Sequence, residues 1–417
     1  MVIGGGFAGI NFSNALSRHE QYRVTLVDRN NYNFFTPLLY QVATGFLEPS
    51  SISYPFRKLF QQRKNQRFRL GELIRIIPEE KKAVLSTGEL LYDYLVLAMG
   101  TESNFFGMEN VRKNSLPLKS IGEALTIRNM MLQKLEDASA GTDPVKQRQL
   151  LNVVIAGGGP TGVEVAGMLA EMKKNILQKD YPELAGIDSK IVLAHALPEL
   201  LSPMLPGSRK YTYETLLKMG VQIRLNDAVK DYADGVVTFS KSEPVEAATM
   251  IWTAGVVSHV IEGIPAACYG NGKRLIVDEF NAVNGLDSIY ALGDNCVQKH
   301  DPKFPDGHPQ LAQVAMQQGT NLAKNFLRRD QNQKFVPFKY IDKGTMAIIG
   351  RNKAVAELQK PRIAFTGFMA WLIWIFIHLY SLINYRNRVK TFFNWITAYF
   401  SKDQALRMII KPAKPEK

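Results

Sequence analysis

Three glycines near the start of the chain have the spacing of a phosphate-binding loop. Gly4, Gly6 and Gly9 fit GxGxxG, in which the first glycine allows a tight turn, the second lets backbone approach a pyrophosphate, and the third lets a helix pack on a strand. The next predicted strand ends in Asp28, whose carboxylate can accept hydrogen bonds from both ribose hydroxyls. Together these residues predict a dinucleotide site, whereas the alternative is a loop that needs glycine only for positive φ angles.

A second loop repeats this spacing with Gly157, Gly159 and Gly162. Glu164 follows in what we expect to be the first turn of the helix, where it either functions at the site or simply complements the helix dipole. The position expected for the ribose-binding acid holds His195. Without a carboxylate there, a 2′-phosphate is not repelled. His195 could therefore contact that phosphate, and the alternative is a surface histidine beyond a strand end.

A third motif is the pair Gly293-Asp294, at the end of another predicted strand. A carboxylate beside a strand-end glycine can hold a ribityl hydroxyl while backbone approaches a flavin phosphate. The alternative is an aspartate that only completes a turn. We interpret the pair as a second contact to FAD.

The elements around these motifs repeat one plan. Each glycine loop follows an apolar run and precedes a helical pattern, and each unit later has an apolar strand that ends in small residues, at 95–101 and 250–255. A duplicated dinucleotide-binding unit is the simplest explanation. Other expected elements are a helix at 123–135, a loop at 137–144, a helix with the apolar pattern of 312–326, and strands through 339–357.

The fold class predicted from this plan is α/β, with two Rossmann-like domains and a C-terminal helical segment. The FAD-binding domain would comprise residues 1–120 and 265–360, the NAD(P)H-binding domain residues 121–264, and the membrane-anchoring helices residues 361–417. The first strand is short for a buried strand. We therefore expect a few upstream residues to be missing, which would weaken FAD binding.

Composition favours a membrane surface over nucleic acid as the basic chain's partner. The formal net charge is +13, and residues 385–417 contain eight Lys/Arg and two Asp/Glu beside the most apolar stretch. Residues 363–383 contain no charged side chain and are long enough to span a bilayer. However, the next segment has one apolar helical face preceded by basic residues, which favours an interfacial anchor. The same helices could also form a homodimer interface. The apolar face comprises Val389, Phe392, Phe393, Ile396 and Phe400.

The only two cysteines, Cys268 and Cys296, form no CxxC pair, and we interpret them as small buried side chains in a reducing compartment. No metal-ligand spacing and no Ser/His/Asp set is visible. The chemistry would therefore come from a flavin that the protein orients.

At this point the sequence resembles a known family, the type II NADH dehydrogenases, which are single-subunit, non-pumping NADH:quinone oxidoreductases. The resemblance covers nearly the whole chain and departs from the family at the short N-terminus and at His195. It is most specific in the last two of the following segments: GGGFAG, VDRNNYNFFTPLLYQVATG, YDYLVLAMGT, AGGGPTGVE, WTAGV, YALGD, AQVAMQQG and YIDKGTMAIIGRNKAV.

The resemblance implies a hydride transfer from NADH to FAD and a two-electron reduction of membrane quinone without proton pumping. NADPH remains an alternative donor. The enzyme would be a peripheral, monotopic protein on the cytoplasmic face of the inner or plasma membrane, with no nucleic-acid partner. Further cofactor contacts are expected at Phe7, Ala8, Arg29, Leu73, Ala98, Gly100, Thr101, Thr161, Ala254, Gly255 and Ala312.

Two glutamines four residues apart mark the expected quinone end. Gln313 and Gln317 share one helix face, and their amides could donate to quinone carbonyl oxygens. The small residues Ala312, Ala315 and Gly319 would leave room for a flat ring. On composition alone the glutamines would be read as exposed, so their role, like that of Lys343 near the flavin, is what the resemblance implies.

Two rival functions follow from the same sequence. A sulfide:quinone oxidoreductase of the same fold would need both cysteines beside the flavin. A non-catalytic redox sensor would bind a partner or nucleic acid through the basic tail, and turnover with NADH and quinone would exclude it.

Overall fold

The computed structural model describes residues 1–359, 362–401 and 406–410, so parts of the predicted anchor at 361, 402–405 and 411–417 lie outside the described residues. The described chain forms two compact units, each assembled from three segments. Unit 1 comprises residues 1–34, 54–102 and 256–343, and unit 2 comprises residues 35–53, 103–255 and 344–417. The domain boundaries expected from the sequence stay a prediction.

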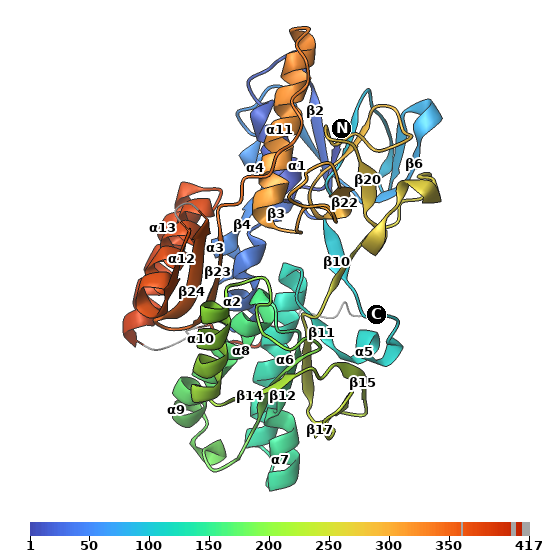
Figure 1. The fold of residues 1–417 in the computed structure, drawn as a ribbon. Coiled ribbons are helices and arrows are strands. Elements are labelled where there is room, and N and C mark those ends of the chain that lie inside the picture. Colours follow the sequence, from blue (N-terminus) through green and yellow to red (C-terminus); the bar gives the residue numbers. More distant parts are fainter. Residues whose placement is uncertain (360–361, 402–405, 411–417) are drawn as a thin grey trace, which may run out of the picture. The chain divides into compact units, whose positions relative to one another are not determined.

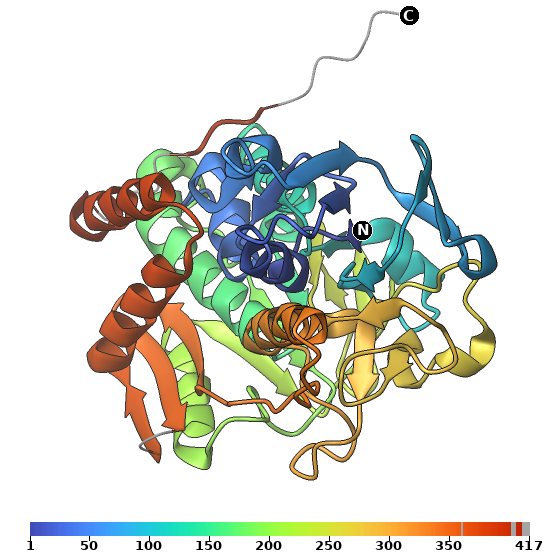
Figure 2. The same ribbon diagram turned by 90° about the horizontal axis from the view of Figure 1, so that it is seen from above.

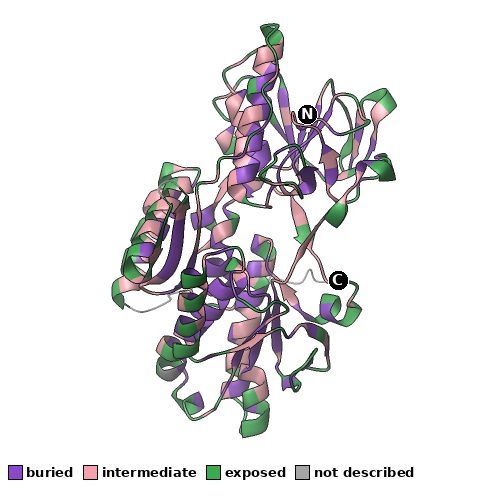
Figure 3. Cartoon of the chain, viewed as in Figure 1, coloured by how far each residue is buried: buried purple, intermediate pink, exposed green. Residues whose placement is uncertain are grey.

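Unit 1 is built on a five-stranded parallel sheet of order β21-β9-β1-β2-β5. The central strand β1 pairs through Val2 with Leu26 on one side and with Val96 on the other. Buried apolar residues make up most of β1, β2, β9 and β21, as a parallel sheet covered on both faces requires, whereas the edge strand β5 has one, Phe68 (Figure 3). The strands are β1 (Val2–Ile3), β2 (Val24–Asp28), β5 (Gln66–Leu70), β9 (Leu95–Leu97) and β21 (Ile289–Ala291).

Helices α1 (Phe7–Ala15) and α11 (Ala312–Asp330) lie side by side in unit 1 (Figures 1 and 2). Phe12 and Phe326 join them edge to face, with ring centroids 5.5 Å apart. The remaining elements of this unit are α4 (Phe56–Leu59), η2 (Pro78–Glu80), η5 (Ala266–Cys268), η6 (Asn271–Lys273), η7 (Gly293–Asn295), the antiparallel sheet β6-β7-β8 (Leu73–Ile77, Lys82–Leu85, Gly88–Leu91), the pair β20 (Leu275–Val277) and β22 (Cys296–Gln298), β3 (Tyr32–Phe34) and β19 (Val256–Ser258).

Unit 2 repeats the plan with a parallel sheet of order β11-β18-β12-β13-β14. In both units the strand before the glycine loop is central, and the strand that ends in Asp28 or His195 is its neighbour. This confirms the duplicated Rossmann-like plan. The strands are β11 (Leu116–Pro117), β12 (Val153–Ala156), β13 (Ile191–His195), β14 (Val221–Leu225) and β18 (Thr249–Trp252).

The long helix of unit 2, α6 (Ile121–Ser139), begins with a capping box formed by Ser120 and Glu123. It extends beyond the predicted helix and takes up the start of the loop expected at 137–144, and four residues separate its end from α7 (Pro144–Leu151). That loop prediction was therefore wrong at residues 137–139 and 144 and right at residues 140–143.

The other elements of unit 2 include a three-stranded antiparallel sheet against which helix α12 packs. They are α2 (Leu39–Ala43), α3 (Pro49–Ile52), α5 (Glu109–Asn114), α8 (Pro160–Met172), α9 (Gln178–Asp180), α10 (Pro206–Lys218), α12 (Gly367–Ser381), α13 (Tyr385–Ser401), the short helices η1 (Thr36–Leu38), η3 (Lys173–Leu177) and η4 (Pro182–Leu184), the hairpin sheet β15 (Val229–Ala233), β16 (Val236–Phe239) and β17 (Val245–Glu246), and the sheet β23 (Thr345–Gly350), β24 (Lys353–Gln359) and β25 (Arg362–Thr366). Strands β4 (Ser53–Pro55) and β10 (Thr101–Ser103) each contain residues of both units.

Candidate functional site

The first glycine loop has the geometry that the motif predicts. Gly4 has a φ of 101°, and a Cβ there would lie 2.3 Å from the carbonyl oxygen of Ala98. A Cβ on Gly9 would lie 2.0 Å from the carbonyl oxygen of Gly4, so α1 packs on the loop only because that atom is missing. Gly6, in contrast, has no atom within 4 Å of its Cβ position. Neighbouring backbone therefore leaves no room for a side chain at the first and third glycines, whereas the second glycine, Gly6, borders space that no protein atom fills.

The N-terminus of α1 leaves its first backbone N–H groups available to an anion. Gly6 is the N-cap residue, and no side chain caps the helix. Uncapped N–H groups at a helix start, beside the open face of Gly6, suit a pyrophosphate. Phe7 is half-buried and Ala8 is buried at this turn. These residues fit the phosphate end of FAD.

Asp28 lies beside this loop at the end of β2. Its Oδ2 accepts the N–H of Gly5 at 2.7 Å, and its Oδ1 accepts the N–H of Asn30 at 2.7 Å. Burial raises the pKa of Asp28 above its usual value, and these two hydrogen bonds and the exposed Arg29 oppose the rise. A carboxylate fixed in this way can present its remaining lone pairs to ribose hydroxyls.

The second glycine loop reproduces the same three environments. A Cβ on Gly157, whose φ is 114°, would lie 2.7 Å from the carbonyl oxygen of Thr253, and one on Gly162 would lie 1.8 Å from the carbonyl oxygen of Gly157. Gly159 again has no atom within 4 Å of its Cβ position. Gly159 is also the N-cap of α8, which has no side-chain cap and continues through Pro160 and the half-buried Thr161.

His195 takes the structural place that Asp28 has in unit 1. Its Nδ1 accepts the N–H of Gly158 at 3.1 Å, as Asp28 accepts the N–H of Gly5. His195 is the last residue of β13 and half-buried, so the reading as a surface histidine beyond the strand was wrong. Burial lowers the pKa of His195, which favours the neutral ring. With Nδ1 as acceptor, Nε2 carries the proton and can donate.

Glu164 lies deeper than the sequence indicated. It is the fifth residue of α8, so the predicted position in the first turn was wrong, and the alternative that it only complements the helix dipole loses its basis. Its side chain is buried, which raises the pKa well above its usual value, while a hydrogen bond from the backbone N–H of Ile348 opposes the rise. This environment therefore favours the protonated form of the carboxyl more than water does.

The raised pKa of Glu164 predicts that unfolding stability depends on pH. A carboxyl whose pKa is higher in the folded than in the unfolded chain favours folding at low pH, and this contribution is lost as pH rises through the folded-state value. Wild-type stability should therefore fall with rising pH, by up to about 1.4 kcal/mol per pH unit for one proton. Glu164→Gln should reduce that slope, while Glu171 and Asp28, whose pKa values burial also raises, still contribute to it.

Denaturant titrations of the two proteins, from below the ordinary glutamate pKa of 4.5 upward, measure this difference. The exposed Glu243 of the same unit provides the matched control, and Glu243→Gln should keep the wild-type slope. Parallel pH profiles for wild type and Glu164→Gln would contradict the assignment.

The Gly293-Asp294 turn is held by a residue that we did not predict. Gln318, which is 2% exposed, accepts the N–H of Gly293 through Oε1 at 2.7 Å. Gly293 has a φ of 72° and Asp294 is half-buried. The signal was present in the sequence, because Gln318 shares a helix face with Val314 and Leu322, and a glutamine on an apolar face needs a buried partner.

Asn33 was missed as well. Its Nδ2 donates to the carbonyl oxygen of Gly5 at 2.6 Å, and the side chain is 6% exposed. Asn33 therefore binds the carbonyl group of Gly5, whereas Asp28 binds the N–H group of the same residue. Both bonds fix the first glycine loop. No spacing rule connects a position so far along the chain to the loop.

Gln313 and Gln317 both bind the segment that carries Lys343. Gln317 makes two hydrogen bonds with the backbone of Ile341, since its Nε2 donates to the carbonyl oxygen at 2.9 Å and its Oε1 accepts the N–H at 3.0 Å. The Oε1 of Gln313 accepts the backbone N–H of Lys343 at 3.1 Å. Each amide has a second N–H. The side chain of Lys343 is exposed.

Two of the small residues of α11 do not leave the space we expected. A Cβ on Gly319 would lie 2.4 Å from the carbonyl oxygen of Ala8, and Ala315 is buried next to Gly293 and Ala8. Both residues let α11 approach α1 closely, so the prediction that they leave room for a flat ring was wrong. Ala312 is half-buried at the start of the helix.

The remaining predicted contacts follow strand ends in both units. Gly100, with a φ of 69°, has no atom within 4 Å of its Cβ position, and Thr101 begins β10. Ala254 and Gly255 follow β18 and are half-buried. Leu73 begins β6 and packs against the apolar core of unit 1, and its role in cofactor binding stays a prediction.

Both cysteines are buried free thiols, as predicted. Burial raises the pKa of Cys296 to about 12 and also raises that of Cys268. The Sγ of Cys296 donates to the carbonyl oxygen of Gly293 at 3.4 Å, and that of Cys268 donates to the carbonyl oxygen of Asn284 at 3.3 Å. Protonated, buried thiols are poor carriers of sulfur.

The C-terminal helices expose an apolar surface. In α13 the exposed fractions of Phe393 and Phe400 are 61% and 76%, and in α12 that of Phe376 is 70%. Among the described residues no helix has both the length and the apolarity that a membrane crossing needs. Of the basic residues in the first turns of α13, Arg386 is exposed and Lys390 forms an ion pair with Glu48.

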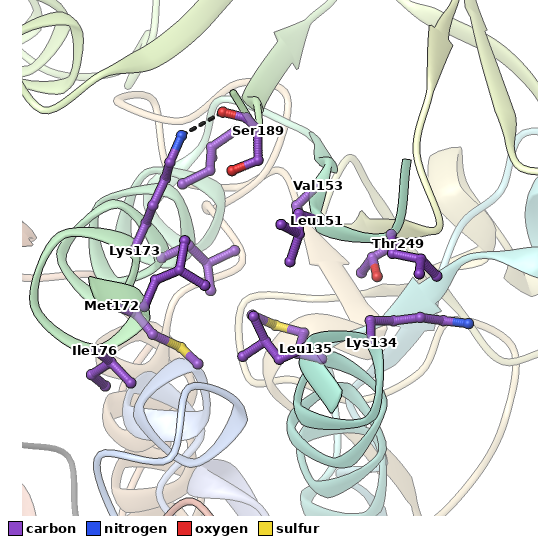
Figure 4. Close-up of a pocket in the computed structure, with 14 residues that line it drawn as sticks. Lys134, Leu135, Leu151, Val153, Met172, Lys173, Ile176, Ser189 and Thr249 are labelled. Carbon is purple, nitrogen blue, oxygen red and sulfur yellow. Dashed lines mark hydrogen bonds between the residues drawn. The ribbon is translucent and has the colours of Figure 1, made fainter. Parts of the chain in front are cut away.

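A pocket in unit 2 lies away from the glycine loop (Figure 4). Val153 and Thr249, the first residues of β12 and β18, line it, whereas the loop follows the last residue of β12. Nucleotides bind at the carboxyl ends of parallel strands. This pocket, whose empty volume is about 590 Å³, is therefore not the dinucleotide site.

Comparison with known proteins agrees with this geometry. The family model described as pyridine nucleotide-disulphide oxidoreductase matches residues 1–319, and the NDH2 C-terminal domain matches residues 343–402. The type II NADH:quinone oxidoreductase NdhA of Mycobacterium tuberculosis is 32% identical over 96% of this chain and 87% of its own. A mitochondrial external alternative NADH-ubiquinone oxidoreductase of Yarrowia lipolytica is 28% identical over 95% of this chain and 78% of its own.

Solved structures show the same fold. NDH2 from Plasmodium falciparum in complex with NADH superposes with a TM-score of 0.88 at 22% identity, over 98% of this chain and 99% of that one. A sulfide:quinone oxidoreductase from Aquifex aeolicus reaches a TM-score of 0.73 at 21% identity, over 93% and 91% of the two chains.

Proposed function

Because the chain belongs to the type II NADH:quinone oxidoreductases, FAD-dependent peripheral membrane enzymes of the pyridine nucleotide-disulphide oxidoreductase family, we propose that Gln313, Gln317 and Lys343 form the quinone end of its site. The observation that carries this proposal is the pair of hydrogen bonds between Gln317 and Ile341, together with the bond from Lys343 to Gln313. Both glutamines thereby position the segment with the lysine. Gln317 has a second amide N–H besides the one that binds Ile341, and this N–H would donate to a quinone carbonyl oxygen.

The proposed cofactor residues bind and orient FAD and the nicotinamide nucleotide. FAD, when bound, supplies the hydride-accepting ring and the electron transfer to the quinone. The uncapped start of α1 and the open Gly6 would hold its pyrophosphate, and Asp28 its ribose. The start of α8, the open Gly159 and the Nε2 of His195 would do the same for the nicotinamide nucleotide. NADH stays the predicted preference over NADPH.

Glu164 is proposed to act at the nicotinamide end as a neutral hydrogen-bonding group. Its burial and its bond from Ile348 support this role, since a protonated carboxyl can donate as well as accept. The membrane face is proposed to be cytoplasmic, which the two buried free thiols support as a feature of reducing compartments. The homodimer considered from the sequence stays a prediction.

The quinone proposal predicts that Gln317→Leu separates the two half-reactions. Losing both bonds to Ile341 frees the Lys343 segment, and we expect flavin reoxidation by a short-chain quinone to slow at least about tenfold, or about 1.4 kcal/mol. Flavin reduction by NADH should stay within about twofold of the wild-type rate. Stopped-flow absorbance of the flavin measures both rates.

Gln331→Leu is the matched control, because Gln331 is an exposed glutamine just beyond the end of α11. It should leave both rates unchanged. Equal slowing of the two half-reactions in Gln317→Leu would remove this glutamine from the quinone end.

A further inference from the structure

A second pocket of unit 2 lies among α8, β23, α12 and α13, with an empty volume of about 670 Å³ counted out to its mouth. None of the residues predicted to bind cofactor or quinone lines it. Three of the chain's four tryptophans do, in a wall made of Phe46, Met168, Ile348, Trp371, Trp374, Ile375, Trp395 and Ala398.

The helices that form this wall also carry the exposed apolar surface. Trp374 of α12 and Trp395 of α13 face inward with 1% and 8% exposure, whereas other aromatic residues of the same helices are exposed. The pocket therefore lies directly behind the membrane-binding surface of the same unit. The exposed apolar residues of the two helices are Phe368, Met369, Leu372, Phe376, Tyr380, Tyr385, Phe392, Phe393, Ile396 and Phe400.

Three cations act on Glu171, the carboxyl that lines one side of the pocket, and Arg351 is the one among them that lines it as well. Arg351 and Glu171 line it, and the backbone N–H of Arg351 donates to Glu171 at 2.5 Å. Lys174 and Lys353 also act electrostatically on Glu171, so three cations surround one carboxyl. Burial is the largest influence on Glu171 and raises its pKa, which weakens its ability to neutralise these cations.

Two donors at the pocket lack acceptors. The Nε of Arg351 and the Nε1 of Trp374 are buried and have no hydrogen-bond partner in the part of the chain that the structure describes. The guanidinium of Arg351 is held over the ring of Tyr399, 4.2 Å from its centroid. Buried donors without partners are uncommon and indicate a missing acceptor.

We propose that this pocket binds one anionic phospholipid, with an acyl chain among the tryptophans and the phosphate at Arg351. The tryptophan wall suits an apolar part of a ligand. The cations near Glu171 and the unpartnered N–H groups of Arg351 and Trp374 suit an anion with acceptor oxygens. A free phosphate would leave the aromatic walls unused, and a quinone is uncharged and would leave the cations unused. The lipid would tie α12 and α13 to α8 and fix the anchor to the nucleotide-binding unit.

The test compares lipids on the full-length holoenzyme. Native mass spectrometry of the detergent-solubilised protein, incubated with phosphatidylglycerol or phosphatidylcholine, counts bound lipids. We expect one phosphatidylglycerol per chain, at least tenfold preferred over phosphatidylcholine. Phosphatidylglycerol brominated on its acyl chains should quench the tryptophan fluorescence, and inorganic phosphate should not displace it. Equal retention of the two lipids, or displacement of the lipid by a short-chain quinone, would overturn the proposal.

Two variants locate the bound lipid. Ala398→Phe fills the pocket and should reduce lipid retention at least tenfold, and Arg351→Gln should abolish the preference for the anionic lipid. Phe393→Glu is the matched control on the exposed face of α13, because it should weaken vesicle binding but keep the retained lipid. NADH-driven dye reduction reports folding in each case. If Ala398→Phe does not fold, the wild-type comparison of the two lipids still decides the question.

Discussion

Asp28→Ala is expected to yield a protein that purifies almost free of flavin. The substitution removes the acceptor of two N–H groups, those of Gly5 and Asn30, each bound at 2.7 Å. Hydrogen bonds to a charged group contribute about 1.5–3 kcal/mol each. Losing both, together with the ribose contact, should weaken FAD binding at least about 100-fold. The ratio of flavin to protein absorbance after gel filtration measures the loss.

Two further variants separate charge from general damage. Asp28→Asn keeps one acceptor oxygen but no charge, so we expect flavin content between those of wild type and Asp28→Ala. Asp287→Ala removes an exposed acid just before β21 in the same unit and should retain the full complement. If Asp28→Ala kept stoichiometric flavin, Asp28 would serve only to shape the loop.

The two glycine motifs could be predicted because their function depends on the Cβ atom that glycine lacks. Spacing alone identifies which glycine must make room for a carbonyl oxygen, and the structure has Gly9 and Gly162 in those positions. The strand after each motif could also be found, since its apolar run is continuous. The fold class followed from the same repetition.

The partner of the second loop could not be read in the same way. Asp28 and His195 share no charge, yet both accept an N–H from the middle of a glycine loop. What the loop requires there is an acceptor atom at a strand end, and an acid and a neutral imidazole both supply one. Residue type therefore suggested a difference in nucleotide choice, whereas geometry shows a common structural task.

The roles of residues in α11 were harder to predict because helix periodicity identifies a face but not what covers it. Gly319 and Ala315 were expected to face a ligand, but α1 lies there. Gln317 was expected to be an open donor, but it binds the backbone of Ile341, a residue in a separate loop segment. Contacts between segments distant in sequence leave no local signal.

Gly162→Ala and Gly159→Ala are expected to damage NADH oxidation for different reasons, although they lie three residues apart in one loop. A methyl group on Gly162 would lie 1.8 Å from the carbonyl oxygen of Gly157, so α8 must move away from the loop. Overpacking of this kind costs about 1–3 kcal/mol. We expect a lower Tm and a KM for NADH raised at least about tenfold.

Gly159→Ala should keep the wild-type Tm, because its Cβ position has no protein atom within 4 Å. The methyl group would instead occupy space that the nucleotide pyrophosphate needs, and the KM for NADH should rise by a similar factor. Thermal unfolding and NADH-driven dye reduction measure the two effects separately. An unchanged KM in Gly159→Ala would mean that the nucleotide does not approach this glycine.

Both variants should leave flavin binding and the reoxidation of flavin by quinone unchanged. Their glycines belong to unit 2, whereas the loop proposed to hold FAD belongs to unit 1, so flavin content should match the wild type. Flavin reduced chemically, without NADH, should then be reoxidised by a short-chain quinone at the wild-type rate. Slow reoxidation in Gly159→Ala, whose fold is expected to be undisturbed, would show that this loop serves the quinone half-reaction too, and the proposed division between the two glycine loops would be wrong.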